Sequence, residues 1–267
     1  MAKQTQGRPS GSQKSSKAPA RNQKGMYTVL GLIAAAFAVF IVYQMNQPTG
    51  QEAAKIDAST PLPSAAGYTM GKADAPVKVI EFADFECPAC AQFFTLTEPD
   101  VRTRLIETGQ ISYTFMDFPL PMHPNTWPAS NAAACANEQG KFWEYHDILF
   151  QMQDQWNGFA TRRPGGKFKE FAEQLGLDVG KWEACYDEQR YNLNIKAHEQ
   201  EAVKRGAGQT PTFIIGSRRV PGSIAFDKFK AYVDTALAEA GPLQAPAGGD
   251  TARRTTTNVV PEKKGTP

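Results

Sequence analysis

The chain has 267 residues, which is long enough for one or two folded domains. Its 29 basic and 27 acidic residues give a formal net charge of +2, and six of the basic residues lie in the first 25 positions. The remainder is nearly neutral, so nothing in the composition indicates a nucleic-acid-binding surface.

Residues 1–25 are predicted to form a disordered basic tail, because they contain no acid and almost no apolar side chain larger than alanine. Residues 26–45 (MYTVLGLIAAAFAVFIVYQM) are uncharged and mostly apolar. A helix of this length, rising about 1.5 Å per residue, would cross a hydrocarbon core of about 30 Å. The alternative is a cleaved signal peptide, but the apolar run is longer than the usual ~7–15 residues and no convincing cleavage site follows.

The charges on either side of this segment predict its orientation. The basic residues of the tail precede it, and the first acid, Glu52, follows it. The positive-inside rule then places the tail in the cytoplasm and the rest of the chain outside. The sequence predicts a single-pass membrane protein with a cytoplasmic N-terminus and an extracytoplasmic domain.

The remaining chain divides into a linker, a domain and a second tail. Residues 46–66 contain Pro and Ala and are predicted to be a spacer, and the domain is predicted to run from 67 to 240. Residues 241–267 are rich in Pro, Gly, Ala and Thr without a helical or strand period, which predicts disorder. All four cysteines lie in the predicted exported domain, where disulfides persist: Cys87, Cys90, Cys135 and Cys185.

The predicted domain begins with a strand, helix, strand unit. Residues 75–85 (APVKVIEFADF) are almost uniformly apolar around Lys78, as expected of a strand covered on both faces. Helical spacing follows the first cysteine pair and is interrupted at Pro99. Residues 110–120 read as a second strand, which we expect to pair in parallel with the first through a right-handed crossover.

The rest of the domain is predicted to be a helical block, a hairpin and a closing helix. Residues 127–205 have helical patterns punctuated by Gly and Pro. Residues 210–222 give two short strands joined at Gly216 and Ser217, a pair suited to a type II′ turn. An amphipathic helix follows, with apolar residues at helical spacing: Phe226, Phe229, Val233 and Leu237. This order predicts an α/β fold with an inserted helical block.

The C-x-x-C pair of Cys87 and Cys90 admits three interpretations. A zinc site needs two further ligands, yet Cys135 and Cys185 are about 50 residues apart and the histidines form no H-x3-5-H pair. A spatial site that adds His123 stays open. A purely structural crosslink over so small a loop would constrain little of the chain.

The third interpretation is a redox couple. If Cys87 is the N-cap of a helix, Pro88 occupies the first helical position, where its missing N–H is no loss. The free N–H groups of Ala89 and Cys90 and the helix dipole then favour a Cys87 thiolate. A thiolate of depressed pKa is also a good leaving group, so the disulfide becomes a better oxidant.

Three segments together resemble the DsbA-like thiol:disulfide oxidoreductases of the thioredoxin superfamily, in the membrane-anchored bacterial branch. They are EFADFECPACAQFF, AAACANEQGKFWEYHDILF and GQTPTFIIG, and the resemblance covers about residues 67–240. It implies a thioredoxin fold with a helical insertion and an enzyme that oxidises exported proteins with free cysteines. It also implies re-oxidation by a quinone-linked membrane partner of the DsbB or vitamin K epoxide reductase type. We expect no metal and no cofactor.

The resemblance also assigns roles to the residues of the site. It makes Cys87 the nucleophile and Cys90 the resolving cysteine, and it places the family's cis-proline at Pro211, preceded by Thr210. The residues implied to contact substrate are Pro88, Ala89, Thr210 and Pro211. The most oxidising members often carry His at the position of Ala89, so one stabiliser of the thiolate is absent here.

Glu81 matches the family's buried acid beneath the active site. A carboxyl buried there would have a raised pKa and could exchange a proton with Cys90. The alternative is an edge carboxylate that reaches solvent.

Cys135 and Cys185 both fall in the predicted helical block. We expect them to form a structural disulfide, and two buried free thiols are the alternative. Among the histidines, His146 and His198 lie on predicted helices, and only His123, in FPLPMHPN, is expected near the site.

Two other functions remain open on the sequence. One is a disulfide reductase or isomerase with the same fold, because the sequence does not determine the direction of electron flow. The other is a metal-binding or chaperone module without turnover.

Overall fold

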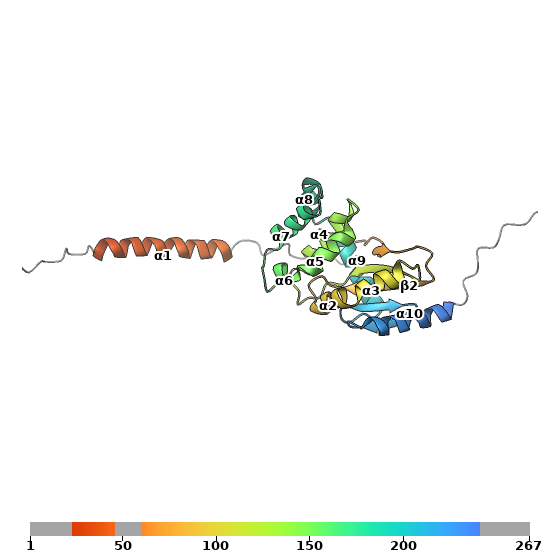
Figure 1. The fold of residues 1–267 in the computed structure, drawn as a ribbon. Helices are drawn as coiled ribbons and strands as arrows, with labels where there is room; N and C mark the ends of the chain where they lie inside the picture. The colour runs from red at the N-terminus through yellow and green to blue at the C-terminus, as the bar shows by residue number, and fades with distance from the viewer. Residues whose placement is uncertain (1–22, 46–59, 241–267) are drawn as a thin grey trace, which may run out of the picture. The chain divides into compact units, whose positions relative to one another are not determined.

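The computed structural model describes residues 23–45 and 60–240 (Figure 1). The chain divides into two units, residues 1–48 and 49–267. Nearly all of the predicted basic tail, most of the predicted linker and all of residues 241–267 lie outside the described residues.

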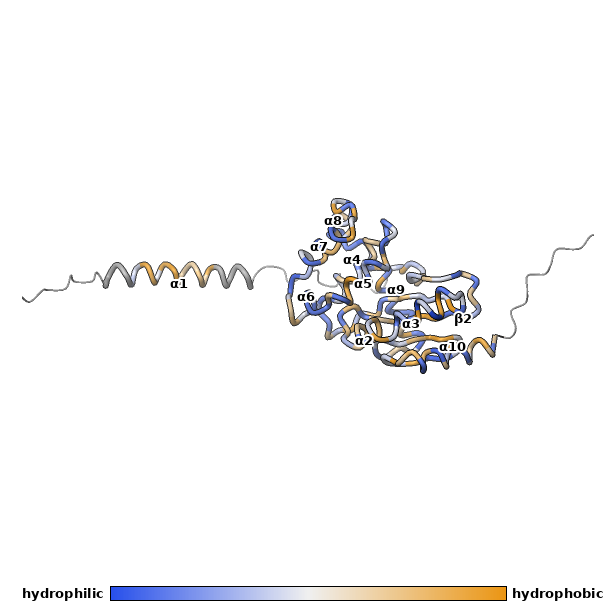
Figure 2. The backbone as a smooth tube through the Cα atoms, viewed as in Figure 1, coloured by the Kyte–Doolittle hydropathy of each residue, from blue (hydrophilic) through white to orange (hydrophobic). Residues whose placement is uncertain are grey.

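The first unit contains one helix, α1 (Gln23–Met45). Its side chains are described from Tyr27 to Val39, and all of them are exposed. Most of this stretch is hydrophobic (Figure 2). Judged on the described residues alone, no helix has both the length and the hydropathy needed to span a membrane.

The second unit is built on a five-stranded sheet in the order β1-β3-β2-β4-β5. Strands β2 and β3 are parallel, and the other neighbouring pairs are antiparallel. The bounds are β1 (Tyr68–Met70), β2 (Val77–Ala83), β3 (Ile111–Asp117), β4 (Thr212–Ile215) and β5 (Arg218–Pro221). The strands predicted within 75–85 and 110–120 are therefore present and pair in parallel. The hairpin predicted at 210–222 is also present, as the antiparallel pair β4 and β5.

Gly216 joins β4 to β5 with φ +58°, the sign that a type II′ turn requires at its first central residue. The sequence analysis did not predict β1. A strand of three residues, with intermediate or exposed side chains, has too few positions for a period to appear.

One face of the sheet packs against helices from both ends of the domain. These are α2 (Pro88–Leu96), α3 (Glu98–Val101), the π-helical turn η1 (Arg102–Ile106) and α10 (Phe226–Ala240). Phe93 of α2 and Phe229 of α10 contact Phe213 of β4 with ring centroids 4.5 and 5.6 Å apart. The helix after the cysteines ends at Leu96, just before Pro99, as the sequence predicts.

The insertion between β3 and β4 consists of helices that pack on one another and on the sheet (Figure 1). Its centre is aromatic, with Tyr145, Trp156, Phe168 and Trp182 all at most 1% exposed. The bounds are α4 (Thr126–Asn137), α5 (Phe142–Gln151), α6 (Gln153–Trp156), α7 (Gly165–Gln174), α8 (Val179–Asp187) and α9 (Asn192–Lys204).

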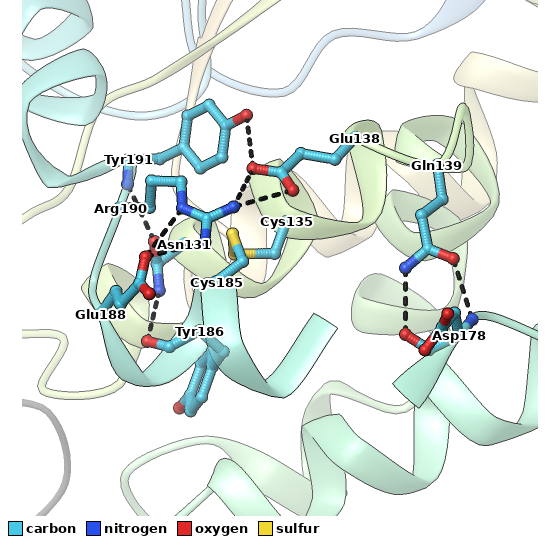
Figure 3. A network of polar contacts seen from close by, with 10 residues as sticks. All are labelled: Asn131, Cys135, Glu138, Gln139, Asp178, Cys185, Tyr186, Glu188, Arg190 and Tyr191. Atoms are coloured by element: carbon cyan, nitrogen blue, oxygen red, sulfur yellow. Dashed lines mark hydrogen bonds and ion pairs between the residues drawn. A yellow bond between two sulfur atoms is a disulfide. The ribbon is translucent and has the colours of Figure 1, made fainter. Parts of the chain in front are cut away.

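A disulfide joins two helices of this insertion. Cys135 of α4 and Cys185 of α8 have their sulfurs 2.00 Å apart and their Cα atoms 5.7 Å apart (Figure 3). Around it, Arg190 pairs with Glu138 at 2.8 Å, and the Asn131 amide donates to the carbonyl of Tyr186. The crosslink lies in the insertion, apart from the C-x-x-C pair.

Candidate active site

The cysteine pair lies where the loop after β2 enters α2. Cys87 is the N-cap, with extended backbone dihedrals (φ −74°, ψ 123°), and Pro88 begins the helix. The Cys87 carbonyl accepts hydrogen bonds from the N–H groups of Cys90 and Ala91, each at 3.1 Å. Cys87 is 6% exposed and Cys90 1%, and both are free thiols, so this is the reduced form of the couple.

The helix start makes the two thiols electrostatically unequal. The pKa of Cys87 is lowered to about 6, and the largest cause is a hydrogen bond from the Cys90 side chain. Burial opposes this shift. Hydrogen bonds from Thr210 and from the N–H groups of Cys90 and Ala89 add to the lowering. Burial is the largest cause that raises the pKa of Cys90 well above its usual value, reinforced by the Cys87 thiolate and by Glu81. At neutral pH the reduced pair therefore holds one thiolate, on Cys87, and one thiol.

The loop before β4 covers the cysteines. The Thr210–Pro211 peptide is cis, and the Thr210 carbonyl oxygen lies 3.5 Å from the Cys87 sulfur, where it accepts a hydrogen bond when that sulfur is protonated. The Pro211 carbonyl instead accepts from the N–H of Gly222, at 2.7 Å. Of these two carbonyls, that of Thr210 is the one that faces the reacting sulfur.

Glu81 lies in the centre of the sheet, on β2, and is 2% exposed. The Tyr113 hydroxyl on the neighbouring strand donates to its carboxyl oxygen at 2.5 Å. Burial, followed by the charge of Glu98, raises the pKa of Glu81 to about 8, while the Tyr113 hydrogen bond and Arg102 oppose the shift. Glu81 is therefore a buried, largely protonated acid and not a solvent-exposed edge carboxylate.

A partly buried ionic network lies beside this acid and was not predicted from the sequence. The Arg102 guanidinium bonds Glu98 at 2.6 and 2.8 Å and forks onto both carboxyl oxygens of Asp147 at 2.8 and 2.5 Å. The ring of His146 lies 2.9 Å from Asp147. The network joins η1 to α5, so it ties the insertion to the thioredoxin-like part; only spatial proximity, which no local sequence pattern shows, could have revealed it.

This network also contains the set of potential metal ligands that the described residues bring together. Donor atoms of Glu98, His146 and Asp147 all lie within 4.8 Å of one another. Arg102 already pairs with both carboxylates, so the geometry is that of a partly buried salt bridge. Cys87, Cys90 and His123 do not form such a group in the described part of the chain, which gives no support to the zinc alternative.

His123 lies on the other side of the cysteine pair, in the loop after β3. Its Nδ1 atom is 2.7 Å from Asp84, which precedes Cys87 by three residues. A cavity of about 430 Å³ opens at this point, and its lining includes Pro88, Glu86, His123 and the exposed Phe159. His198, by contrast, pairs with Asp117 on the insertion side of the sheet.

Comparisons with known proteins agree with this geometry. The family profile described as Thioredoxin matches residues 64–235, well over half of the chain. The probable disulfide bond formation protein D of Bacillus anthracis is 35% identical over 182 residues, covering 63% of this chain and 77% of that protein. Its namesake in Bacillus subtilis is 25% identical over 189 residues, covering 68% of this chain and 82% of that protein.

A second group of relatives is much longer. The Na(+)/H(+) antiporter NhaA 3 of Salinispora tropica is 34% identical over 186 residues, covering 69% of this chain but 27% of the antiporter. The chain thus spans about a quarter of the length of these curated relatives.

Solved structures show the same fold. The crystal structure of oxidised BdbD from Bacillus subtilis superposes with a TM-score of 0.59 at 23% identity, covering 68% of this chain and 100% of that one. For DsbA from Chlamydia trachomatis the TM-score is 0.60 at 18% identity, over 70% of this chain and 100% of that one. Together with the C-x-x-C couple at a helix start and the cis-proline beside it, these matches show that the chain belongs to the thioredoxin family, in its DsbA-like group of thiol:disulfide oxidoreductases.

Proposed function

We propose that this protein is a membrane-tethered, extracytoplasmic oxidase that introduces disulfide bonds into exported proteins. The observation that carries the proposal is the unequal pair at the start of α2, where the pKa of Cys87 is lowered to about 6 and that of the buried Cys90 is raised. Lowering the pKa of one thiol stabilises the reduced pair relative to the disulfide, and this makes the disulfide a stronger oxidant.

The reaction begins with the Cys87–Cys90 disulfide. A substrate thiolate attacks the Cys87 sulfur, a substrate–Cys87 bond forms, the Cys87–Cys90 bond breaks, and the electron pair leaves on Cys90. A second substrate thiolate then attacks the substrate sulfur of the mixed disulfide. The substrate leaves oxidised, and the enzyme keeps two electrons as the Cys87 thiolate and the Cys90 thiol.

Glu81 supplies the proton that Cys90 needs when it leaves. Cys90 is buried, so an unprotonated thiolate there is costly, and the pKa of Glu81, raised to about 8 mainly by burial, keeps a proton available at neutral pH. Re-oxidation runs the transfer backwards, with Glu81 receiving the proton from Cys90.

We assign substrate contact to four residues near the reacting sulfur: Pro88, which is exposed, Ala89, which is half-buried, and Thr210 and Pro211, which are buried. The Thr210 carbonyl lies 3.5 Å from the Cys87 sulfur, which a substrate must approach. An extended substrate segment could pair with this loop through its backbone, as peptides do at other exposed backbone edges.

The two electrons must pass to an acceptor, for which we assign a quinone-linked membrane protein of the DsbB or vitamin K epoxide reductase type. The name of the Bacillus relatives, disulfide bond formation protein D, supports a role in forming disulfide bonds. The uncharged segment 26–45 and the exposed apolar side chains of α1 support the tether.

The test traps the substrate on the full chain in its native cells. Cys90→Ala leaves a nucleophile without its resolving partner, so we expect mixed disulfides that are dissolved by reductant; Cys87→Ala should capture nothing. A Cys87→Ala variant that captures as much as Cys90→Ala would overturn the assigned roles.

The direction of electron flow is decided by a second measurement, the equilibrium of the Cys87–Cys90 couple with glutathione. An oxidase predicts a couple more oxidising than about −200 mV, and a reductase one near −270 mV. Catalysed reduction of insulin by a strongly reducing couple would favour the reductase alternative.

A further inference from the structure

Asp84, three residues before the nucleophilic cysteine, is buried and pairs with the partly exposed His123. The Asp84 side chain is completely buried, and one of its oxygens lies 2.7 Å from His123 Nδ1. The carboxylate also accepts the N–H of Glu86 and that of Leu120, both at 2.8 Å. With both its oxygens held, Asp84 fixes the orientation of the imidazole ring.

This pair is coupled to the active site through the backbone and through a shared cavity. The Asp84 carbonyl accepts the N–H of Cys87 at 3.0 Å, so the two residues cannot move independently. His123 lines the cavity of about 430 Å³ that also borders Pro88. Its side chain is 16% exposed, which lets the charged form of the ring keep part of its hydration.

We propose that His123, held by Asp84 as an imidazolium, stabilises the Cys87 thiolate and makes the oxidising power of the couple depend on pH. It would thereby act in place of the histidine that this chain lacks at Ala89. The inference deepens the proposed function and rests on it only in taking Cys87 as the nucleophile. His123 is a positioning residue here, because it acts through its charge and forms no bond with substrate.

The charges around the ring support this assignment. The hydrogen bond to Asp84 is the largest cause that raises the pKa of His123; burial opposes it, and the charges of Asp84, of the Cys87 thiolate and of Glu86 add to it. The Cys87 charge exists only in the reduced state, since a disulfide sulfur carries none. Reduction should therefore increase the affinity of His123 for a proton.

The first measurement needs no substitution. The chain has three histidines, so the full chain in detergent, labelled with ¹³C on histidine, gives few ring signals to titrate by NMR. We expect His123 to titrate at a higher pH in the reduced protein than in the oxidised one. Identical titration in both redox states would overturn the proposal.

The second measurement separates charge from hydrogen bonding. His123→Asn keeps a donor near the position of Nδ1 but loses the charge, and His123→Lys keeps a charge. We expect the thiolate fraction of Cys87 at pH 6, and the equilibrium constant for oxidising glutathione, to fall about two- to fivefold in His123→Asn, the size expected of one charge in a partly hydrated site. His123→Lys should retain most of both and lose the pH dependence that the titration of His123 contributes.

Met122→Ala is the matched control, because Met122 lines the same cavity and is exposed but uncharged. It should leave both quantities unchanged. By reciprocity, the factor lost in His123→Asn should approach, as the pH falls below the titration of His123 in both redox states, the factor by which reduction changes its proton affinity. A His123→Asn protein with an unchanged thiolate fraction would overturn the inference, whereas a wild-type protein without oxidase activity would overturn only the proposed function.

Discussion

Cys87 lies at the N-cap of α2 and Cys90 lies one turn inside it, and this difference in position explains their different acidities. An N-cap residue faces the helix N–H groups that have no partner within the helix, so a negative charge there is stabilised. A side chain one turn further on is covered by the helix, and Cys90 is 1% exposed. The acidity of each thiol therefore follows from its position in the C-x-x-C motif, at the helix start or one turn inside the helix.

Glu81 presents the opposite case, a charge that the fold disfavours. It occupies a strand position between Val79 and Ala83, both at most 1% exposed, where an apolar residue would be the stable choice. The hydrogen bond from Tyr113 satisfies one carboxyl oxygen but does not replace water around an anion. Because burial disfavours the Glu81 carboxylate, the side chain holds its proton at neutral pH, which fits the proposed role of proton donor to Cys90.

The effect of Glu81→Gln on stability follows from this raised pKa. The unfolded chain loses the Glu81 proton near pH 4.5 and the folded chain near pH 8. Between these values the unfolded state binds fewer protons, so wild-type stability should fall as pH rises and level off above about 8. Glu81→Gln cannot ionise, and it should be more stable than the wild type at pH 8 by roughly 2–5 kcal/mol.

Denaturant unfolding of the reduced wild type and of reduced Glu81→Gln at pH 5 and pH 8 checks this. Subtracting one free energy of unfolding from the other at each pH cancels the contribution of groups that titrate in both proteins. The same substitution should slow substrate oxidation about tenfold or more, since Gln cannot deliver a proton to Cys90. Equal stability differences at the two pH values would show that Glu81 does not hold its proton as described.

At the scale of elements, local sequence patterns predicted the strands, turns and helix starts that are determined by residues close together in the chain. Strands β2 and β3, the hairpin around Gly216 and the helix beginning at Pro88 all follow from apolar runs or from residues with special backbone preferences. The short β1 was missed, because it is stabilised by pairing with β3, more than 40 residues away in the chain.

The ionic network was missed for a related reason. Glu98 and Arg102 are four residues apart on α3 and η1, a spacing that commonly occurs on solvated helix faces. Their burial results from the approach of Asp147 on α5, which the sequence does not show. The same holds for the Asp84–His123 pair, whose members are 39 residues apart.

The crosslink between α4 and α8 should contribute to stability without taking part in turnover. It closes a loop of 50 residues, so its removal should lower the free energy of unfolding by about 4 kcal/mol in the chain-entropy model. We expect Cys135→Ser together with Cys185→Ser to show this loss and to retain most oxidase activity at a temperature where the protein stays folded.

Tryptophan fluorescence is a suitable probe for this experiment, because all four tryptophans lie in the insertion and Trp182 is on the same helix as Cys185. The matched control replaces Cys87 and Cys90 by serine, which should abolish activity and leave the insertion intact. A crosslink variant that lost activity but kept its stability would assign Cys135 and Cys185 to the chemistry instead.

At the scale of the whole molecule, the two units have different chemical requirements. The second unit contains a buried disulfide and a C-x-x-C pair, and structural disulfides persist in oxidising compartments. The first unit carries basic residues followed by an uncharged apolar segment. The proposed tether across a membrane fits both, because it would keep the couple near the proposed membrane-bound electron acceptor and outside the reducing cytoplasm.

This argument predicts the orientation of the chain, with residues 1–25 in the cytoplasm and the domain outside. Single cysteines placed at Ser10 and at Ser64, in a chain whose own four cysteines are replaced by serine, report the two sides. Ser64 is exposed and precedes β1, so a cysteine there should react with a membrane-impermeant maleimide in intact cells. A cysteine at position 10 should react only after the membrane is permeabilised. Protection of position 64 in intact cells would place the domain in the cytoplasm, where glutathione and thioredoxin keep thiols reduced, and the assignment as an oxidase of exported proteins would then be wrong.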